Sequence, residues 1–464
     1  MHMSESILKT KKIVSGLFGR HEDFSEGSLE KCYVVHNSKA VVVKARNNKK
    51  NEKIMNRKTI ITALLVLVAT TSIVAQDLIK TATAPISFSK KDFADTIKIK
   101  VLDGAVIVPV EIEGQTRNLL FDTGSPLGLW HGQKEDWMKK ITTDSLMFGD
   151  INKRNRNQII YQFPSIKMGN LQIENYPMIV EDAMSEFTCN KFDGVIGFNL
   201  VGKGLSFKLD TKDSLLIVTD RKKFFAEEEK GQPTAKYRMK RAYCPLVYVD
   251  SPFGWIEMVF DTGALNTWLA LSQEDLDRWF QKNPKKRKLL DDLTLQTDTT
   301  INTSVGLYGL STDTLVGRLL HFTKIKIDKL PVNDLYITTA HPTMRVGSAV
   351  LKHASLIIDA PKKQFVFMPH NGQDITVGNS ETGSASFIPS EAGDTLGVLK
   401  AVIRKGSIAY KKGIRTGDYL IEVNGISIKD ICTYMLMERK DEEALFKFRS
   451  PKGIDKIVRL KRTN

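Results

Sequence analysis

The chain has 464 residues, 42% of them hydrophobic, and a formal net charge of +15. This length suits two or three domains with buried cores, and the composition excludes an enzyme embedded in a membrane. Residues 1–75 hold 13 basic and 6 acidic side chains, which leaves 55 and 47, or a diffuse +8, for the rest of the chain. Basic runs interleaved with aromatic residues are missing, so we expect no nucleic-acid partner.

The N-terminal part carries an export pattern. Basic residues 57–58 precede an apolar run at residues 60–69 and small residues at 72–75. This order is typical of a secretory signal peptide, which we predict over residues 55–75. Translation would then start at Met55, and residues 1–54 would be an upstream extension outside the mature protein. A membrane anchor is the competing interpretation, but the apolar run is short for a span. We expect export to the periplasm or exterior, with no stable membrane span after signal removal.

A five-residue motif occurs twice. Phe121-Asp122-Thr123-Gly124-Ser125 recurs as Phe260-Asp261-Thr262-Gly263-Ala264. Three further anchors repeat in the same order: paired valines before each Asp, a similar strand pattern after it, and an apolar-apolar-Gly signal followed by an apolar-Asp pair. The spacing predicts an internal duplication. We assign residues 76–220 and 242–369 to two lobes, with a charged connection at 221–241.

Each motif follows a predicted strand. Apolar alternation over residues 97–110 and 117–121 indicates β-strands with turns at Gly104 and Gly114, the last strand running into Asp122. Glycine after each Asp-Thr permits unusual backbone angles and close approach of the other lobe. Glu135 and Glu274 are predicted near the starts of helices after the motifs, as solvent-facing charges.

Two polar stretches are candidates for hairpins that close over a cleft. One covers residues 151–163 and includes Tyr161; the other covers residues 303–309 and includes Tyr308. Their alternative is a solvated loop, and the sequence does not separate the two.

The paired carboxylates suggest a chemistry. Hydrolysis of a peptide bond without a metal or covalent nucleophile needs an activated water and an acid for the leaving amine. Two carboxylates that share one proton supply both functions. Asp122 and Asp261 are the only acidic residues with matching contexts. We expect no cofactor.

The four cysteines show no metal-ligand spacing, so no metal site is expected. A disulfide between Cys189 and Cys244 would bridge the lobes. Unpaired buried thiols are the favoured alternative.

The two lobes resemble the pepsin-retropepsin superfamily of aspartic peptidases. The resemblance rests on the two Asp-Thr-Gly triplets, on residues 194–197, and on residues 346–351 leading to 357–359. It implies a mainly β fold of two lobes around a substrate cleft, with Asp122 and Asp261 as the catalytic pair. It also implies reciprocal inter-lobe hydrogen bonds of Thr123 and Thr262, and a Ser125 that buttresses Asp122. Gly124 and Gly263 complete the support, whereas Ala264 replaces the hydroxyl that is common there.

The C-terminal residues form a separate unit. A Gly/Ser/Thr-rich stretch at 370–385 indicates a linker. Residues 386–464 resemble a PDZ domain of bacterial protease type, on residues 406–409, 413–418 and 423–425. The resemblance implies a small β-barrel-like domain with one or two helices that binds chain ends by strand addition; a purely structural role is the alternative.

These patterns together predict an exported, monomeric aspartic endopeptidase that acts on polypeptides. The alternative is a catalytically weak, protease-like protein of the cell envelope that binds polypeptides.

Overall fold

The computed structural model describes residues 29–36, 39–46, 79–102, 104–141, 145–183, 185–189, 191–240, 243–372, 374–378, 385–437 and 443–461, which fold mainly as β-strands. The chain divides into two compact units, Met1–Val68 and Ala69–Asn464. In the first unit, β1 (Leu29–His36) and β2 (Lys39–Arg46) pair as an antiparallel hairpin. The predicted signal peptide at 55–75, with its start at Met55, lies outside the described residues.

The first large sheet of the second unit ends one of its strands at Asp122. Its order among the described residues is β3-β13-β8-β14-β7-β6-β12-β9, with β5 beside β6. Strands β6 and β7 form a hairpin that turns at Gly114, where φ is +71°. The strands are β3 (Ser87–Phe88), β5 (Lys100–Leu102), β6 (Ala105–Ile112), β7 (Gln115–Phe121), β8 (Gly128–Trp130), β9 (Lys139–Lys140), β12 (Ile160–Met168), β13 (Leu171–Val180) and β14 (Gly194–Ile196).

This sheet is buried on both faces, which explains the nearly continuous apolar sequence of β6 and of the end of β7. Val108 and Phe121 face the main core, whereas Ile107 and Leu120 face a second apolar cluster. Successive side chains of a strand point to opposite faces, so both faces of a buried strand must be apolar.

The second large sheet has a similar plan. Its order is β21-β27-β20-β19-β25-β26-β30, with β18 beside β19 and β22 beside β25. Hairpin strands β19 and β20 here correspond to β6 and β7, and β20 runs into Asp261. The strands are β18 (Arg238–Lys240), β19 (Cys244–Ser251), β20 (Gly254–Phe260), β21 (Leu269–Ser272), β22 (Thr294–Ile301), β25 (Thr314–Ile327), β26 (Leu330–Thr338), β27 (Ala340–Val346) and β30 (Ile375–Thr376).

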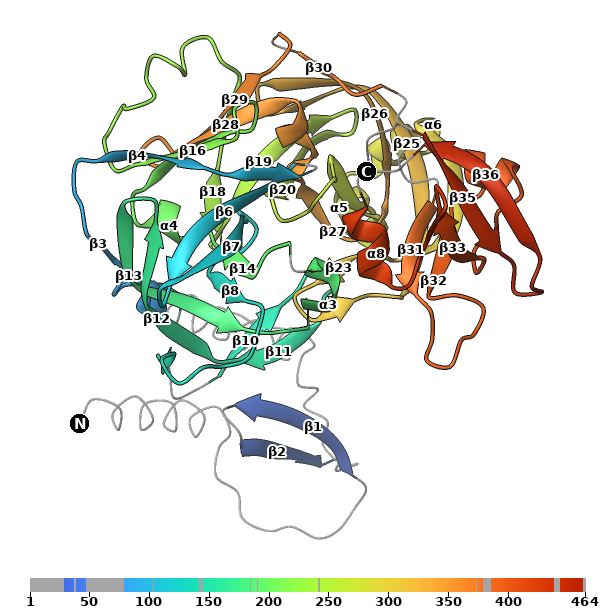
Figure 1. Cartoon of the computed structure of the whole chain (residues 1–464), viewed down its shortest axis with the longest axis horizontal. Helices are drawn as coiled ribbons and strands as arrows, with labels where there is room; N and C mark the ends of the chain where they lie inside the picture. The colour runs from blue at the N-terminus through green and yellow to red at the C-terminus, as the bar shows by residue number, and fades with distance from the viewer. Residues whose placement is uncertain are drawn as a thin grey trace. The chain divides into compact units, whose positions relative to one another are not determined.

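A six-stranded sheet connects segments that are far apart in the sequence (Figure 1). Its order is β17-β29-β28-β15-β16-β4. Its strands are β4 (Ala94–Lys98), β15 (Ser206–Asp210), β16 (Leu215–Thr219), β17 (Thr234–Lys236), β28 (Ala354–Asp359) and β29 (Gln364–Pro369). Phe207 and Phe365 of this sheet pack on Phe121 and Phe260, with ring centroids 5.0 Å and 4.4 Å apart. One core therefore lies beneath both strands that end in an Asp-Thr-Gly motif.

Short hairpins and helices complete this part of the chain. The hairpins are β10 (Leu146–Gly149) with β11 (Asn155–Gln158), and β23 (Val305–Gly306) with β24 (Gly309–Leu310). The α-helices are α3 (Ser185–Thr188), α4 (Asn199–Gly202), α5 (Gln273–Lys282) and α6 (Arg287–Asp292); η1 (Pro284–Lys286) and η2 (Ser348–Lys352) are 3₁₀ helices. None of the helices within the described ranges is long and apolar enough to cross a membrane.

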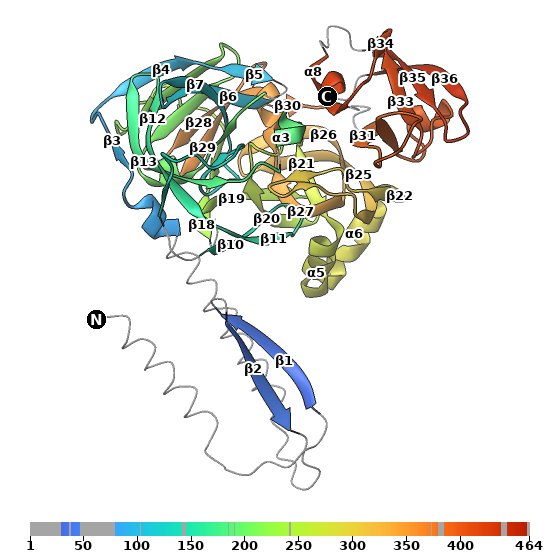
Figure 2. The same cartoon turned by 60° about the horizontal axis from the view of Figure 1, so that its bottom comes forward.

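The C-terminal residues have their own sheet and core (Figure 2). The sheet order is β31-β32-β33-β35-β36, with β34 beside β33, and its core includes Leu420, Phe446 and Phe448. The elements are β31 (Ala385–Pro389), β32 (Leu399–Ile403), α7 (Ile408–Lys411), β33 (Tyr419–Val423), β34 (Ile426–Ser427), α8 (Ile431–Leu436), β35 (Glu443–Arg449) and β36 (Asp455–Lys461). The strands and helices expected from the sequence are present here.

The structure adds detail to three local predictions. Glu135 lies in a turn rather than at a helix start, although Glu274 does lie in the first turn of α5, which Ser272 caps. The predicted linker contains β30, whose Ile375 is buried and pairs with Val332 of β26, and Val377 packs against the same core. The predicted connection at 221–241 likewise contributes β17 and β18 to two sheets.

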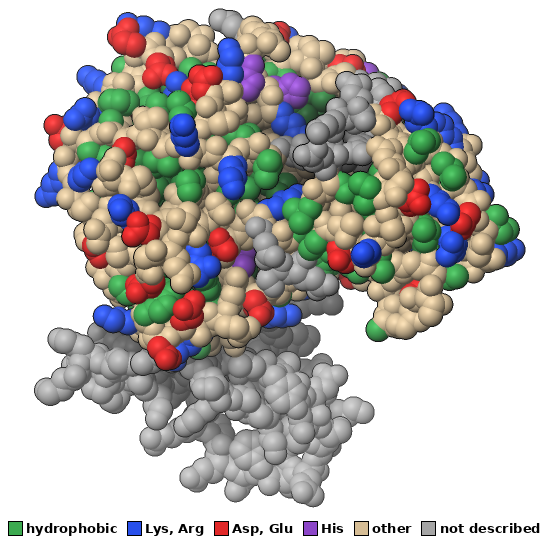
Figure 3. Space-filling view, in the orientation of Figure 1, with side chains coloured by type: hydrophobic (Ala, Val, Ile, Leu, Met, Phe, Trp, Pro, Cys, Tyr) green, Lys and Arg blue, Asp and Glu red, His purple; other side chains and the backbone are tan. Residues whose placement is uncertain are grey.

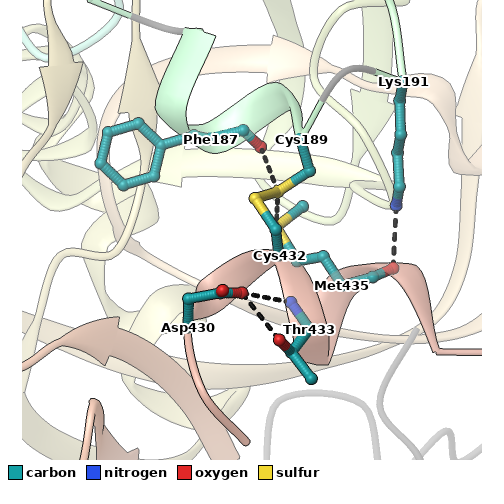
Figure 4. Close-up of a disulfide and its surroundings, with 7 residues drawn as sticks. All are labelled: Phe187, Cys189, Lys191, Asp430, Cys432, Thr433 and Met435. Atoms are coloured by element: carbon teal, nitrogen blue, oxygen red, sulfur yellow. Dashed lines mark hydrogen bonds between the residues drawn. A yellow bond between two sulfur atoms is a disulfide. The ribbon is translucent and has the colours of Figure 1, made fainter.

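The cysteine predictions also need correction. Cys189 forms a disulfide with Cys432 of α8, across 243 residues and with a Cα–Cα distance of 5.3 Å (Figure 4). Cys189 is therefore neither bonded to Cys244 nor an unpaired thiol, as the two alternatives had it. Lys191 donates from Nζ to the Met435 carbonyl at 3.1 Å beside the disulfide. Nothing in the local sequence around Cys189 and Cys432 indicates their pairing, because only the fold brings them together.

Candidate active site

The two motif loops are held by the same backbone contact. The Asp122 N–H donates to the Ile196 carbonyl at 2.9 Å, and the Asp261 N–H donates to the Val346 carbonyl at 2.8 Å. Ile196 ends β14, which runs parallel to β7, and Val346 ends β27, which runs parallel to β20. Each aspartate therefore leaves its strand at the same point relative to a parallel neighbour.

The two threonines connect the loops through reciprocal hydrogen bonds. The Thr123 hydroxyl donates to the Phe260 carbonyl at 2.6 Å and accepts from the Thr262 N–H at 3.1 Å. In the other direction, the Thr262 hydroxyl donates to the Phe121 carbonyl at 2.7 Å and accepts from the Thr123 N–H at 3.0 Å. Both threonines are buried, so these four bonds are shielded from water and fix one loop against the other.

Each motif glycine faces the carboxylate of the other motif. A Cβ on Gly124 would lie 2.4 Å from the Asp261 Cγ, and one on Gly263 would lie 2.5 Å from the Asp122 Cγ. Real Cβ atoms do not approach other atoms so closely. Glycine is therefore required at both positions by the contact between the loops, and the two carboxylates meet at their interface.

The carboxylates differ in their hydrogen bonds. Asp122 Oδ1 accepts from the N–H of Gly124 at 2.7 Å and from that of Gly263 at 3.1 Å. Asp261 Oδ1 accepts from the Ala264 N–H at 3.0 Å. Burial, and next the negative charge of Asp261, raise the pKa of Asp122 well above its usual value. Such a carboxyl keeps its proton at a pH where an exposed aspartate has lost it.

Two neighbours of the motifs have other contacts. The Ser125 hydroxyl donates to the Leu127 carbonyl at 2.7 Å, so it supports its own loop rather than the Asp122 carboxylate. The Cys244 thiol donates to the Gly124 carbonyl at 3.0 Å. Burial, followed by the charges of Asp122 and Asp261, raises the pKa of this thiol, which keeps it uncharged.

A buried arginine lies at this site and was not predicted from the sequence. Arg345 is 4% exposed, and its Nη1 is 3.6 Å from Asp261 Oδ2. The residue belongs to the repeat of Arg345-Val346-Gly347 with Val195-Ile196-Gly197, where an arginine replaces a buried valine. The arginine at the repeat position where the first half has a valine is the signal that could have identified it.

The two candidate hairpins meet each other. Arg154, in the turn between β10 and β11, donates from Nη1 to the Tyr308 carbonyl at 3.0 Å and from Nη2 to the Leu310 carbonyl at 2.7 Å. The Tyr308 hydroxyl donates to the Phe148 carbonyl at 2.8 Å, and Asn152 Nδ2 donates to the Ser304 carbonyl at 3.0 Å. The β10–β11 and β23–β24 hairpins, one from each half, are thus joined by hydrogen bonds.

The two tyrosines considered from the sequence have different places. Tyr308 is buried between the two hairpins, whereas Tyr161 lies in β12, opposite Met178 of β13. Leu307, next to Tyr308, packs on the apolar cluster that contains Leu120, two residues before Asp122. The joined hairpins therefore border the apolar cluster to which Leu120 of β7 belongs.

The hairpins that lead into the two aspartates differ in what covers their second face. Ile107 and Leu120 pair across β6 and β7 and are covered by Ile79, Ala82 and Phe148 in one buried cluster. The corresponding pair across β19 and β20, Leu246 and Val259, instead lines an open pocket of about 410 Å³. The other lining residues are Ile256, Glu257, Asp275, Trp279, Thr343 and Met344. A largely apolar cavity is thus open on the strands that carry Asp261 and Arg345.

The ionisable side chains that meet between the two motif loops are the carboxyl groups of Asp122 and Asp261. In the part of the chain that the structure describes, no three His, Cys, Asp or Glu side chains are grouped so that they could hold a metal ion. The face in Figure 3 mixes acidic and basic side chains without a continuous basic area.

The chain was compared with protein-family models and with solved structures. No protein-family model matches the chain. Among solved structures the chain is similar to the aspartic proteinase from Irpex lacteus, at 12% identity and a TM-score of 0.36, over 60% of this chain and 98% of that chain. At this identity and TM-score the likeness carries no argument about function. The functional proposal below rests on the geometry of the site.

Proposed function

We propose that the chain is an aspartic endopeptidase with one active site, in which Asp122 and Asp261 act together. The observation that supports this most strongly is the packing of each motif glycine against the carboxylate of the other motif. A turn that served only the fold would not need two carboxylates held at one interface, where like charges oppose each other.

The proposed reaction uses one proton shared by the pair. One carboxylate takes a proton from a water molecule, whose oxygen attacks the carbonyl carbon of the peptide bond, while the other carboxyl protonates the carbonyl oxygen. The resulting gem-diol loses a hydroxyl proton to the second carboxylate as the C–N bond breaks, and the first carboxyl protonates the leaving amine. Both groups return to their starting states, and acid–base help of this kind contributes roughly 10²- to 10⁴-fold.

The substrate class follows from the surroundings. An extended polypeptide would place side chains alternately on the two sides of the dyad. The open pocket lined by Val259, Trp279 and Met344 fits a large apolar side chain, and the carboxylates of Glu257 and Asp275 on its lining would oppose an acidic one. We infer a preference for apolar residues on the Asp261 side of the cleaved bond.

We also propose that the C-terminal sheet acts as a PDZ domain that binds chain ends. Strand β31 lies at the end of its sheet, which leaves one edge for strand addition among the described elements. Phe387 of β31 packs against Tyr434 of α8, with ring centroids 4.8 Å apart, so the helix lies beside this edge strand, where an added chain end would pair.

Export is proposed on the predicted signal peptide. The Cys189–Cys432 disulfide supports it, because disulfides persist mainly in oxidising compartments outside the cytosol.

The experiment that tests the function is digestion of an unfolded protein such as casein by the full chain across pH 3–8, with new termini identified by mass spectrometry. The proposal predicts cleavage that survives a metal chelator and a serine-directed acylating reagent, and that stops with a peptide carrying a secondary alcohol in place of the scissile carbonyl. An inert chain at every pH would overturn it and favour a polypeptide-binding protein.

A further inference from the structure

Arg345 is placed beside the dyad by three strands. It lies in β27, opposite Val259 of the parallel strand β20 and opposite Ala270 of the antiparallel strand β21. A residue paired on both sides has little backbone freedom, and its side chain is 4% exposed. The guanidinium therefore remains near Asp261, with Nη1 3.6 Å from Oδ2.

The matched position beside Asp122 has no charge. Val195 lies in β14, opposite Leu120 of β7 and Leu129 of β8, and is 2% exposed. Val195 and Arg345 each precede the residue whose carbonyl accepts from the motif aspartate. The two positions are thus equivalent, and the site is asymmetric: one carboxylate has a permanent cation and the other an apolar neighbour.

Other ionisable groups nearby do not offset this cation. His341, on the same strand, has its pKa lowered to about 4, first by burial and then by Arg345, so it is neutral above that pH. The Cys244 thiol is uncharged. The acidic groups on the elements that pack against β27 are in ion pairs with residues other than Arg345. These pairs are Glu257 with Arg238, Glu274 with Lys153, Asp275 with Arg278, and Asp277 with Arg287. The basic and imidazole groups on the same elements are Arg318, which pairs with Asp291, His321, which pairs with Asp334, and Arg278, Lys282, Lys324 and Lys326.

We propose that Arg345 fixes the negative charge of the dyad on Asp261 and leaves the shared proton on Asp122. This inference rests on the proposed function and assigns the two roles within it. Asp261 is the base that takes the proton of the attacking water, and Asp122 is the acid that protonates the carbonyl oxygen. In the second step Asp122 takes back the hydroxyl proton of the gem-diol, and Asp261 gives its proton to the amine as the C–N bond breaks. Arg345 is a positioning residue, since it acts through Asp261.

The charge of Arg345 has a defined effect on pH dependence. An opposite charge within about 4–6 Å lowers the pKa of a carboxyl by about 1–3. Arg345 therefore extends activity toward low pH, because the dyad can lose its first proton there. The raised pKa of Asp122 agrees with a proton that stays on that residue.

The test compares Arg345→Met, which removes the charge at similar length, with Arg345→Lys, which keeps it. In R345M the acid limb of the kcat/KM profile against pH is expected to move to higher pH by at least one unit. This shift corresponds to about tenfold lower activity at a fixed pH on that limb. In R345K the limb is expected to stay within half a pH unit of the wild type. A uniform loss of kcat in R345M with both limbs unmoved would indicate a structural role and overturn the proposal.

A second readout does not depend on activity. In the full chain with ¹³Cγ-labelled aspartate, with the Asp122 signal assigned through D122N, Asp122 is expected to keep its proton to higher pH than exposed aspartates do, and this midpoint is expected to shift in R345M but not in R345K. An ionised Asp122 in the wild type at the pH of cleavage overturns the inference even if the chain cleaves casein. If the chain cleaves nothing, the proposed function fails, while this titration still decides the role of Arg345. The wild-type Asp122 signal also decides if R345M does not fold.

Discussion

At the residue scale, Asp122 is the group whose protonation couples the site to folding. Its pKa is raised in the folded chain, so the native state binds more protons than the unfolded chain between the ordinary pKa of about 3.9 and the raised value. The stabilising contribution of Asp122 is fully present below that window and is lost as pH rises through it. A buried carboxylate therefore destabilises the fold at neutral pH.

This predicts a pH-dependent gain for Asp122→Asn. The amide has no charge to lose, so D122N should gain about 1–3 kcal/mol in unfolding free energy relative to wild type between pH 3 and pH 7. Denaturant titrations at both pH values measure it. Asp455→Asn is the control of opposite sign, because a hydrogen bond from Arg449 lowers the pKa of Asp455 to about 2. A D122N difference that does not change with pH would contradict the assignment.

The motif glycines give a second prediction at this scale. Gly124→Ala should lower activity by about 10²-fold or more, because the new Cβ displaces the Asp261 carboxylate and small misplacements of catalytic groups cost that much. Gly202→Ala is the matched control: its Cβ would meet only Met239 Cε, at 4.0 Å, within α4. Assays of both purified variants decide. Equal activity of G124A and G202A would show that the loops do not meet as described.

At the element scale, the contact between the motif loops is concentrated in two threonine hydroxyls. Thr123→Val keeps the shape of the side chain but leaves the Phe260 carbonyl and the Thr262 N–H without this partner. We expect a loss of about 2–4 kcal/mol in unfolding free energy, together with reduced kcat. Thr123→Ser retains the hydroxyl and should stay near wild type in both measurements. If T123V is as stable as T123S, these hydrogen bonds do not hold the loops together.

The elements also show how far the sequence could be read. Strands β6 and β7 were predictable, because burial on both faces demands apolar runs and a glycine turn lies between them. Their counterparts β19 and β20 were predictable from the paired valines and the apolar-Phe pair that repeat before the second motif. The pairing of Asp122 with Asp261 was predictable as well, since the Phe-Asp-Thr-Gly motif recurs and its flanking anchors repeat in the same order.

The features that sequence reasoning missed depend on tertiary contacts. Arg345 differs from Val195 at the matched repeat position, but its neighbours along the chain do not indicate that its side chain lies beside Asp261. Ile375 and Val377 are isolated apolar residues in a polar stretch, and the burial of Ile375 depends on the edge of a sheet formed elsewhere. Each needs the position of a partner that is distant in the sequence.

At the scale of the whole second unit, the C-terminal sheet is tied to both large sheets. The Cys189–Cys432 disulfide joins α8 to the loop after α3. On the other side, Gln296 Nε2 of β22 donates to the Lys405 carbonyl at 2.7 Å, and the Lys405 N–H donates to Asp298 Oδ2 at 3.0 Å. The C-terminal sheet therefore connects the two halves in addition to the motif loops.

Removal of the Cys189–Cys432 disulfide should have a measurable effect on stability. Cys189→Ser with Cys432→Ser opens a link across 243 residues, and we expect a loss of about 2–4 kcal/mol in unfolding free energy. Limited proteolysis should also cut faster between the sheets. A reducing agent should destabilise the wild type but not the double variant. No difference between the two chains under oxidising conditions would contradict a structural role of the disulfide.

The central claim is that two halves of one chain build one catalytic site. The most direct measurement is casein cleavage by D122N alone, by D261N alone and by the two variants mixed. Each variant should fall by roughly 10²- to 10⁴-fold, because each removes one member of the acid–base pair, and the mixture should stay as inactive as its components. Recovery of activity on mixing would place the site between two chains, and full activity of either variant would remove its aspartate from the mechanism.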